Sequence, residues 1–125
     1  MTELRNTEPI DTAACLAILA ERGAAAGLTL TQEQLQQFGT YYERLVETNR
    51  HLNLTTLTSP EDVAVKHFID SLLAYDPALM KDGTTLIDVG TGAGFPGLPL
   101  KIYRPGLKVT LLDSLDKRLR FLQDV

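Results

Sequence analysis

Four glycines within eight residues, placed directly after a short apolar run, constrain this chain more than any other feature. Residues 84–89 are β-branched and apolar after their first positions, which is typical of a strand buried on both faces of a parallel sheet. The glycines that follow are Gly90, Gly92, Gly94 and Gly97. A turn from strand to helix needs residues without a Cβ where the backbone takes positive φ or lets a ligand approach closely. The sequence therefore predicts a ligand-binding turn, with the free N–H groups of the emerging helix directed at the ligand.

A second strand is expected at residues 109–113, after a short helix at residues 98–103 that Pro105 and Gly106 close. Strand, helix and strand in about thirty residues form a right-handed βαβ unit. Another helix opens at residues 116–125. These elements place the chain in the α/β class.

Acidic residues stand at the ends of both expected strands. Asp113 lies 23 positions after Gly90, which fits the rule that an acidic residue about twenty positions beyond such a turn binds ribose hydroxyls. Asp88 precedes the first glycine, where its carboxylate would either meet an ammonium group of a cofactor or accept hydrogen bonds from the amides of the turn itself. The carboxyl ends of parallel strands are where α/β sheets bind ligands, so both residues are candidates for the site.

The spacing of Gly92, Gly94 and Gly97 also satisfies the dinucleotide-binding pattern G-x-G-x-x-G. In that pattern the first glycine follows the strand directly, and here Gly90 takes that place. The position of the first glycine relative to the strand therefore argues against a protein that binds a nicotinamide or flavin nucleotide. That function stays open as an alternative.

Before residue 81 the pattern is helical. Helices are expected at residues 11–25, from Thr31, which has capping-box spacing to Gln34, and from Ser59 to a stop near Pro77. The residues expected on the core-facing sides of these helices are Leu16, Leu19, Ala20, Gly23, Leu35, Phe38, Tyr42, Leu45, Leu52, Ala64, Phe68, Leu72 and Tyr75. We therefore divide the chain into a helical cap, residues 1–80, and the start of a nucleotide-binding sheet, residues 81–125.

Composition excludes several classes of protein. With 44% hydrophobic and 22% charged residues, the chain is neither disordered nor fibrous. It has no apolar run of spanning length, and its single cysteine, Cys15, cannot form an internal disulfide, so a cytoplasmic location is expected. The net charge is −4, but residues 84–125 hold six basic and four acidic residues, so this part can face a polyanion.

Several separate motifs together resemble one family, the bacterial small-subunit ribosomal RNA methyltransferase G family (RsmG, also called GidB), and the resemblance runs from about Gly27 to Val125. Leu-Ile-Asp-Val-Gly-Thr-Gly-Ala-Gly-Phe-Pro-Gly-Leu-Pro-Leu, residues 86–100, resembles the family's cofactor turn. The other matching residues are Asn49, Asn53, Leu54, Thr55, Lys66, His67, Asp70, Ser71, Leu72, Leu111, Leu112, Asp113, Ser114, Leu115, Lys117, Arg118, Phe121 and Leu122.

The resemblance implies a Rossmann-like class I methyltransferase sheet that methylates guanine N7 of 16S ribosomal RNA, free or in the small ribosomal subunit, using S-adenosylmethionine. It implies no metal and no membrane partner. The residues that would line the cofactor site are Asp88, Gly90, Gly92, Gly94, Phe95, Asp113, Ser114 and Leu115. Lys117 and Arg118 would reach RNA phosphates or simply form a solvated helix face.

The roles of several other matching residues are open to more than one interpretation. Phe95 would cover the cofactor's apolar part or pack in the core. His67 is better interpreted as a hydrogen-bonded structural residue than as a catalytic one, and Lys66 with Asp70 as a surface ion pair. No residue is assigned a catalytic role, because guanine N7 carries a lone pair and no proton.

Only two strands are expected, whereas a doubly wound nucleotide-binding domain has five or six. We therefore expect an N-terminal fragment that is inactive in methyl transfer and that associates with itself through uncovered strands. A non-catalytic helical module that binds a protein partner is a further alternative.

Overall fold

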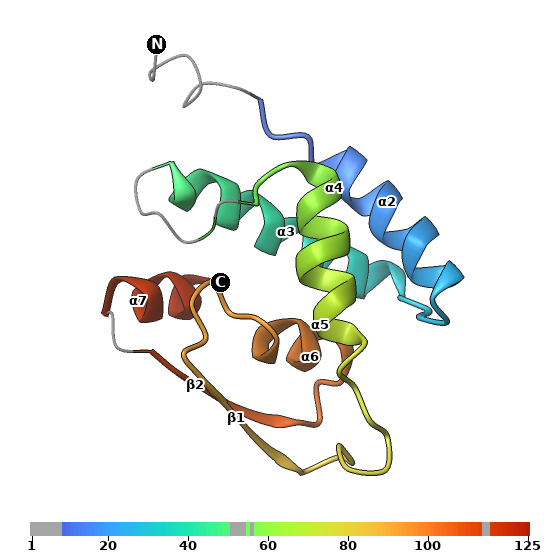
Figure 1. Ribbon diagram of the computed structural model, residues 1–125, viewed down its shortest axis with the longest axis vertical. Helices are drawn as coiled ribbons and strands as arrows, with labels where there is room; N and C mark the ends of the chain where they lie inside the picture. Colours follow the sequence, from blue (N-terminus) through green and yellow to red (C-terminus); the bar gives the residue numbers. More distant parts are fainter. Residues whose placement is uncertain (1–8, 51–54, 56, 114–115) are drawn as a thin grey trace.

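The computed structural model describes residues 9–50, 55, 57–113 and 116–125. Its N-terminal part is helical and its C-terminal part contains a parallel pair of strands (Figure 1). The helical part consists of α2 (Thr12–Ala25), α3 (Gln32–Asn49) and one continuous segment made of α4 (Pro60–Asp62), η1 (Val63–Ile69) and α5 (Asp70–Leu72). The remaining elements are β1 (Thr85–Val89), α6 (Gly97–Tyr103), β2 (Lys108–Leu112) and α7 (Asp116–Asp124).

The helix starts follow the capping residues in the sequence. The Asp11 carboxylate accepts a hydrogen bond from the amide of Ala14 at 3.0 Å, which begins α2. Thr31 and Gln34 form the expected capping box, with backbone amides donating to their side chains at 3.1 and 2.9 Å. Ser59 caps the third segment, and Pro60 occupies its first turn. The predicted starts of these three helices are therefore confirmed.

The third helix differs from the prediction in its middle and at its end. Residues Val63–Ile69 are π-helical, with a wider turn than the α-helix that the periodicity predicts. The segment ends at Leu72, several residues before Pro77, so Tyr75 lies beyond it. Ala64, Phe68 and Leu72 are buried as expected.

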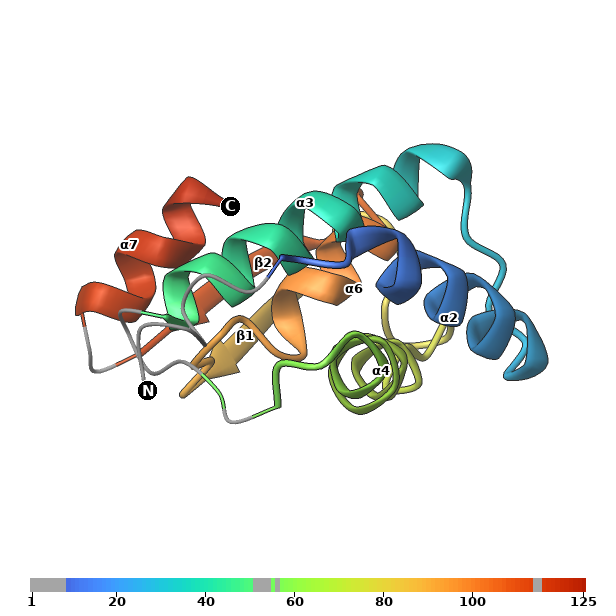
Figure 2. The same cartoon turned by 90° about the horizontal axis from the view of Figure 1, so that it is seen from above.

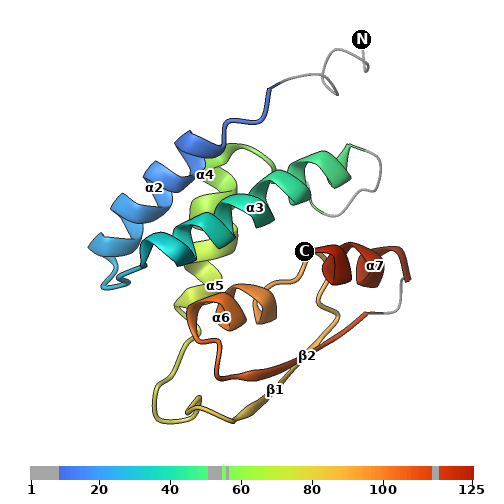
Figure 3. The same ribbon diagram turned by 180° about the vertical axis from the view of Figure 1, so that it is seen from behind.

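The two strands are parallel, with Leu86 beside Val109 and Val89 beside Leu112. The expectation that both faces of this pair are buried is wrong. Ile87, Val89 and Leu112 are 58%, 77% and 48% exposed. The physical reason is visible in Figures 1 and 3, which show the helices on one side of the pair. We call the face without helices the open face; it consists of Thr85, Ile87, Val89, Lys108, Thr110 and Leu112.

The core lies between the helical layer and the inner side of the strands. Figure 2 shows α3 running above α6, with α2 beside it and α7 near the C-terminal end of α3. Helices α3 and α5 both contact α6, so the cap and the strand region share one core. Its largest fully buried side chains include Phe38, Tyr41, Phe68, Leu19, Leu45, Leu72 and Leu100.

The predicted core faces of α2 and α3 are confirmed only in part. Leu19 and Gly23 are buried in α2, but Ala20 is exposed. In α3, Phe38, Tyr42 and Leu45 are buried as predicted, and Leu35 packs at the edge of the core. Leu52 lies outside the described residues. Cys15 is fully buried, and burial raises the pKa of its thiol to about 12, so it serves as a small apolar core residue.

Candidate functional site

The glycine turn leaves the carboxyl end of β1 in an unusual backbone conformation. Gly90, Gly92 and Gly94 have φ values of +70°, +59° and +104°, as the glycine spacing predicts. A Cβ built on Gly90 or on Gly92 would meet no atom within 4 Å. The turn therefore presents two stretches of bare backbone to open space, where a ligand can approach without meeting a side chain.

The amides of the turn are engaged differently from the prediction. We expected free N–H groups directed at a ligand, but most of them donate hydrogen bonds within the chain. The amides with such partners are those of Gly90, Thr91, Gly92, Gly94, Phe95, Gly97 and Leu98. Their acceptors come from the end of β2, from Asp88 and from the turn's own carbonyls, because a chain with this local curvature folds back on itself. Bare Cα surface is thus what the turn offers a ligand.

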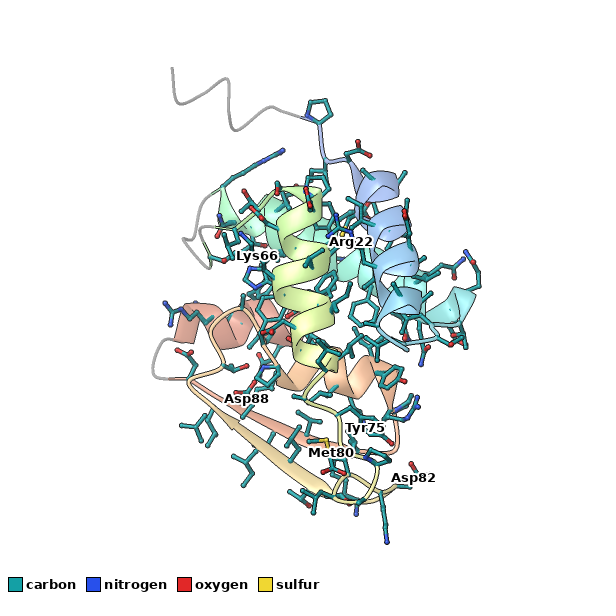
Figure 4. The ribbon with its side chains drawn as sticks, turned by 45° about the vertical axis from the view of Figure 1, so that its right-hand side comes forward. Arg22, Lys66, Tyr75, Met80, Asp82 and Asp88 are labelled. Atoms are coloured by element: carbon teal, nitrogen blue, oxygen red, sulfur yellow. The ribbon has the colours of Figure 1, made fainter. Side chains whose placement is uncertain are left out.

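The Asp88 carboxylate accepts hydrogen bonds from two residues of the turn. Its Oδ2 accepts hydrogen bonds from the Thr91 hydroxyl at 2.8 Å and from the Gly97 amide at 3.0 Å. Figure 4 shows Asp88 at the end of the strands near the turn, with Asp82 at the opposite end. Of the two interpretations given to Asp88, the contacts match the one in which it binds the turn's own donors. Thr91, itself 3% exposed, is a site residue that the sequence pattern did not single out.

Gly97 sits where α6 crosses closest to the strands. A Cβ on it would lie 2.6 Å from Leu111 Cδ2 and 3.0 Å from Asp88 Oδ2. A side chain there would push the helix away from the strand pair, so this glycine is needed for packing.

Asp113 lies beside the turn at the end of β2, as its spacing predicts. Its Oδ2 accepts a hydrogen bond from the Gly92 amide at 2.8 Å and lies 3.5 Å from Nη1 of Arg118. The Asp113 side chain is only 2% exposed, whereas that of Arg118 is 32% exposed. A ligand hydroxyl that reaches this carboxylate would therefore compete with the Arg118 guanidinium, which is more exposed than the carboxylate itself.

The structure describes only part of the remaining predicted site residues. Arg118 lies on α7, with Nη1 3.5 Å from Oδ2 of Asp113. Lys117 belongs to the same helix, but its side chain is not described. Ser114 and Leu115 lie outside the described residues.

Phe95 joins the turn to the helical cap. Its ring stacks on His67, with centroids 4.3 Å apart and planes 5° apart, and it also contacts Tyr41 at 5.6 Å and Phe68 at 6.1 Å. Tyr41, fully buried in α3, donates its hydroxyl to the Ala93 carbonyl. Burial, and then the negative charge of Asp88, raise the pKa of Tyr41 well above its usual value, so the phenol stays protonated and keeps donating. The sequence reasoning missed Tyr41, although its spacing from Phe38 and Leu45 indicates the core-facing side of α3.

His67 is hydrogen-bonded within the chain, as expected for a structural residue. Its Nε2 lies 3.0 Å from the Thr55 hydroxyl. The amide of Thr55 donates to Asn49 Oδ1 at 2.9 Å, which ties Thr55 to the end of α3. Burial lowers the pKa of His67, against weaker opposing effects of a hydrogen bond with the backbone of Leu57 and of the carboxylates of Asp62 and Asp70.

Three further observations concern charge, metals and membranes. Lys66 pairs with Asp62 at 3.3 Å, so the expectation of a Lys66–Asp70 pair is wrong: in the π-helical segment the lysine reaches back toward the first turn. Within the described residues there is no group of three or more histidine, cysteine or acidic side chains that could hold a metal ion. None of the described helices combines the length and the apolar character needed to cross a membrane.

Comparison with known proteins agrees with the family resemblance. The model of a family described as GidB, rRNA small subunit methyltransferase G, matches residues 34–125. A Ribosomal RNA small subunit methyltransferase G from Leuconostoc citreum is 59% identical over 102 residues, which are 80% of this chain and 43% of the relative. Those from Limosilactobacillus reuteri and Pelotomaculum thermopropionicum are 54% and 48% identical over 101 and 106 residues, covering 79% and 85% of this chain and 42% and 44% of the relatives.

The chain thus spans less than half the length of these curated relatives. The matches do not favour the dinucleotide-binding or the non-catalytic alternative. The family match takes in the whole of the glycine turn, both strands and Asp113. On this evidence the chain belongs to the GidB family of rRNA small subunit methyltransferase G proteins.

Proposed function

We propose that the full protein transfers a methyl group from S-adenosylmethionine to N7 of a guanine in 16S ribosomal RNA. One observation carries this proposal: in a member of a methyltransferase family, Gly90 and Gly92 expose bare backbone at the carboxyl end of β1, and the Gly92 amide is hydrogen-bonded to the Asp113 carboxylate, which directly follows β2. We also propose that residues 81–125 begin a Rossmann-like class I sheet and that residues 1–80 form its cap.

The chain's residues would divide the work of binding the cofactor. Gly90 and Gly92 would let an edge of the cofactor lie against the backbone, since any side chain there would occupy that space. Asp113 would accept hydrogen bonds from its ribose hydroxyls, exchanging its contact with Arg118. Ser114 and Leu115 follow directly and would line the same edge. Gly94, Phe95 and Asp88 would shape the turn from its inner side.

The proposed methyl transfer needs no general acid or general base. S-adenosylmethionine supplies a methyl group already activated on a sulfonium. Guanine N7 has an available lone pair and no proton to remove, so no residue of this chain is given a proton-transfer role. The protein's task is to hold the two partners in line and to exclude water, which is catalysis by orientation.

The RNA contacts in this chain would come from α7. Lys117 and Arg118 lie on the helix that follows Asp113, in the part of the sequence with more basic than acidic residues. We propose that both reach phosphates. Arg118 would then link the two ligands, because releasing Asp113 to the ribose frees its guanidinium for RNA.

We further propose that residues 1–125 alone do not methylate RNA. The open face carries three apolar side chains that are about half exposed or more, and the curated relatives contain more than twice the matched length. A sheet with one uncovered face lacks the second helical layer that normally buries that face in α/β domains.

The test is transfer of a labelled methyl group from S-adenosylmethionine to 16S ribosomal RNA and to assembled small subunits by the full-length protein, with N7 methylation read by aniline cleavage. Asp113→Ala should lower the affinity for the cofactor between about ten- and a hundredfold, because a charge-assisted hydrogen bond is lost. Asp82→Ala, an exposed aspartate at the other end of the strands, is the matched control and should change nothing.

Label at an atom other than guanine N7, or no label on either substrate, would contradict the proposal. Robust transfer by the 125-residue chain would contradict the claim that it is inactive alone.

A further inference from the structure

The glycine turn is attached to the molecule on two sides. On one side, Gly90 and Thr91 donate hydrogen bonds to the Leu112 carbonyl, at 2.7 and 3.1 Å, and Gly92 donates to Asp113. These contacts tie the turn's first residues to the end of β2. The following residues, Ala93 to Phe95, lie instead against α3 and η1 of the helical cap.

The contact with α3 is made by Tyr41. Its hydroxyl donates to the Ala93 carbonyl, and both residues are buried, at 0% and 4% exposed. The fit is close, because a Cβ added to Gly94 would lie 2.5 Å from the Tyr41 oxygen. Tyr41 thus fixes the turn where its backbone has the most extreme φ of the three glycines, +104° at Gly94.

The contact with η1 is made by His67. The imidazole lies flat on the Phe95 ring, and its Nε2 interacts with the Thr55 hydroxyl, which also accepts a hydrogen bond from the Leu57 amide at 3.1 Å. Thr55 is in turn bound by Asn49 at the end of α3. The imidazole is therefore held on one side by Thr55, and its ring face holds the Phe95 ring. π-Helical turns often mark functional positions, and this one carries His67.

We propose that Tyr41 and His67 are positioning residues for the cofactor turn, which hold Ala93–Phe95 in place and so set the affinity for S-adenosylmethionine without touching it. The inference rests on the proposed function. Its physical basis is pre-organisation: a turn with several positive-φ residues must be ordered before it can bind, and contacts from the cap supply that order in advance.

The experiment measures the dissociation constant for S-adenosylmethionine by calorimetry, using the full-length protein. Tyr41→Phe removes the hydroxyl and keeps the ring; it should weaken binding between about three- and tenfold, the effect of one lost buried hydrogen bond. His67→Ala removes the ring stacked on Phe95 and should weaken binding to a similar extent. His67→Phe restores a flat ring and should bring the affinity back to within about twofold of the wild type.

Phe38→Leu is the matched control. Phe38 is fully buried in the same aromatic cluster and contacts Phe68 with ring centroids 4.8 Å apart and planes tilted by 48°, but no described ring contact joins it to Phe95. This variant should lower the melting temperature and leave the cofactor affinity unchanged. In methyl-transfer assays, Tyr41→Phe and His67→Ala should raise KM for the cofactor while kcat at saturating cofactor stays near the wild-type value.

The outcomes separate this inference from the proposed function. If Asp113→Ala weakens binding but Tyr41→Phe and His67→Ala do not, the positioning role is overturned and the cofactor site stands. If Phe38→Leu weakens binding as much as they do, the effect is general destabilisation and the inference is again overturned. If Asp113→Ala binds as the wild type does, both proposals fail. Should Tyr41→Phe fail to fold, the His67→Ala and His67→Phe pair decides alone, because His67 is only half buried.

Discussion

The two faces of the parallel strand pair carry three apolar side chains each, but those side chains differ in burial. Leu86, Val109 and Leu111 point inward and pack at the edge of the core beneath α6. Ile87 and Val89, which alternate with them, are 58% and 77% exposed. The turn repeats the contrast: Gly94 is packed against the cap, while Gly90 and Gly92 face open space. The chain therefore has a closed side, fixed by its own helices, and an open side, available to a ligand or to another surface.

The largest effect is expected when a substitution on the closed side is compared with one on the open face by its cost in free energy of unfolding. Phe68→Ala removes a fully buried ring from the aromatic cluster of the closed side and should lower the free energy of unfolding by about 3–5 kcal/mol. Ile87→Ala on the open face should cost about 1 kcal/mol or less, because little buried surface is lost. Urea denaturation of both variants gives the comparison. Equal losses would mean that the open face is covered in solution.

The glycines of the turn should show the same contrast at smaller scale. Gly94→Ala combines a left-handed backbone with a Cβ only 2.5 Å from the Tyr41 oxygen and 2.7 Å from Leu122 Cδ2, and should cost about 2–4 kcal/mol. Gly92→Ala keeps only the backbone penalty of about 1–2 kcal/mol, since its Cβ would meet nothing. A smaller loss at Gly94 than at Gly92 in thermal unfolding would show that the cap does not press on the turn.

Protonation of His67 tests the boundary between cap and turn. Its pKa is lowered in the folded chain, by burial, from an unfolded value of 6.5. Well above pH 6.5 neither state holds the proton, and the contribution of His67 to stability is complete. As the pH falls below 6.5 the unfolded state gains the proton first, so stability declines until the folded pKa is reached.

The measurement is the free energy of unfolding of the wild type and of His67→Gln between pH 7.5 and pH 5.5. The wild type should lose more stability than the variant over this interval. A larger loss in the variant would reverse the sign and contradict the account.

The smallest effect on stability is expected on the open face, where association should change instead. Val89→Lys should alter the free energy of unfolding by no more than about 0.5 kcal/mol. It should also reduce self-association of the 125-residue chain, because a charge then stands among the exposed apolar residues of this face. Sedimentation velocity over a range of concentrations measures it, with Leu79→Lys, at an exposed apolar residue outside the strands, as the control. Identical sedimentation of Val89→Lys and the wild type would exclude this face from association.

The features that the sequence predicted well are those decided by neighbours in the chain. The capping box at Thr31 and Gln34 and the positive φ of Gly90, Gly92 and Gly94 depend on local backbone geometry. The place of Asp113 beside the turn follows from the parallel order of two strands joined by a helix, in which both carboxyl ends meet at one edge.

The features that it missed depend on partners distant in sequence. The burial of Ile87 and Val89 depends on what covers the sheet, which an apolar strand pattern cannot tell. Backbone amides of the turn donate hydrogen bonds to Leu112 and Asp88, and the Tyr41 hydroxyl donates to the Ala93 carbonyl, 52 positions away. The π-helical course of Val63–Ile69 also has no signal in the apolar periodicity. The sequence likewise offers Lys66 an acidic residue four positions away on either side, Asp62 and Asp70, and does not decide between them.

The most direct test of the cofactor site compares two glycines that bracket β1. Gly83 and Gly90 have similar φ values, +85° and +70°, and a Cβ on either would meet nothing within 4 Å. Gly83→Ala and Gly90→Ala should therefore cost the full-length protein similar stability, about 1–2 kcal/mol each. Titration with S-adenosylmethionine should show unchanged affinity for Gly83→Ala and at least about tenfold weaker binding for Gly90→Ala, a difference of about 1.4 kcal/mol. Equal affinities would contradict the claim that the cofactor lies against the turn after β1.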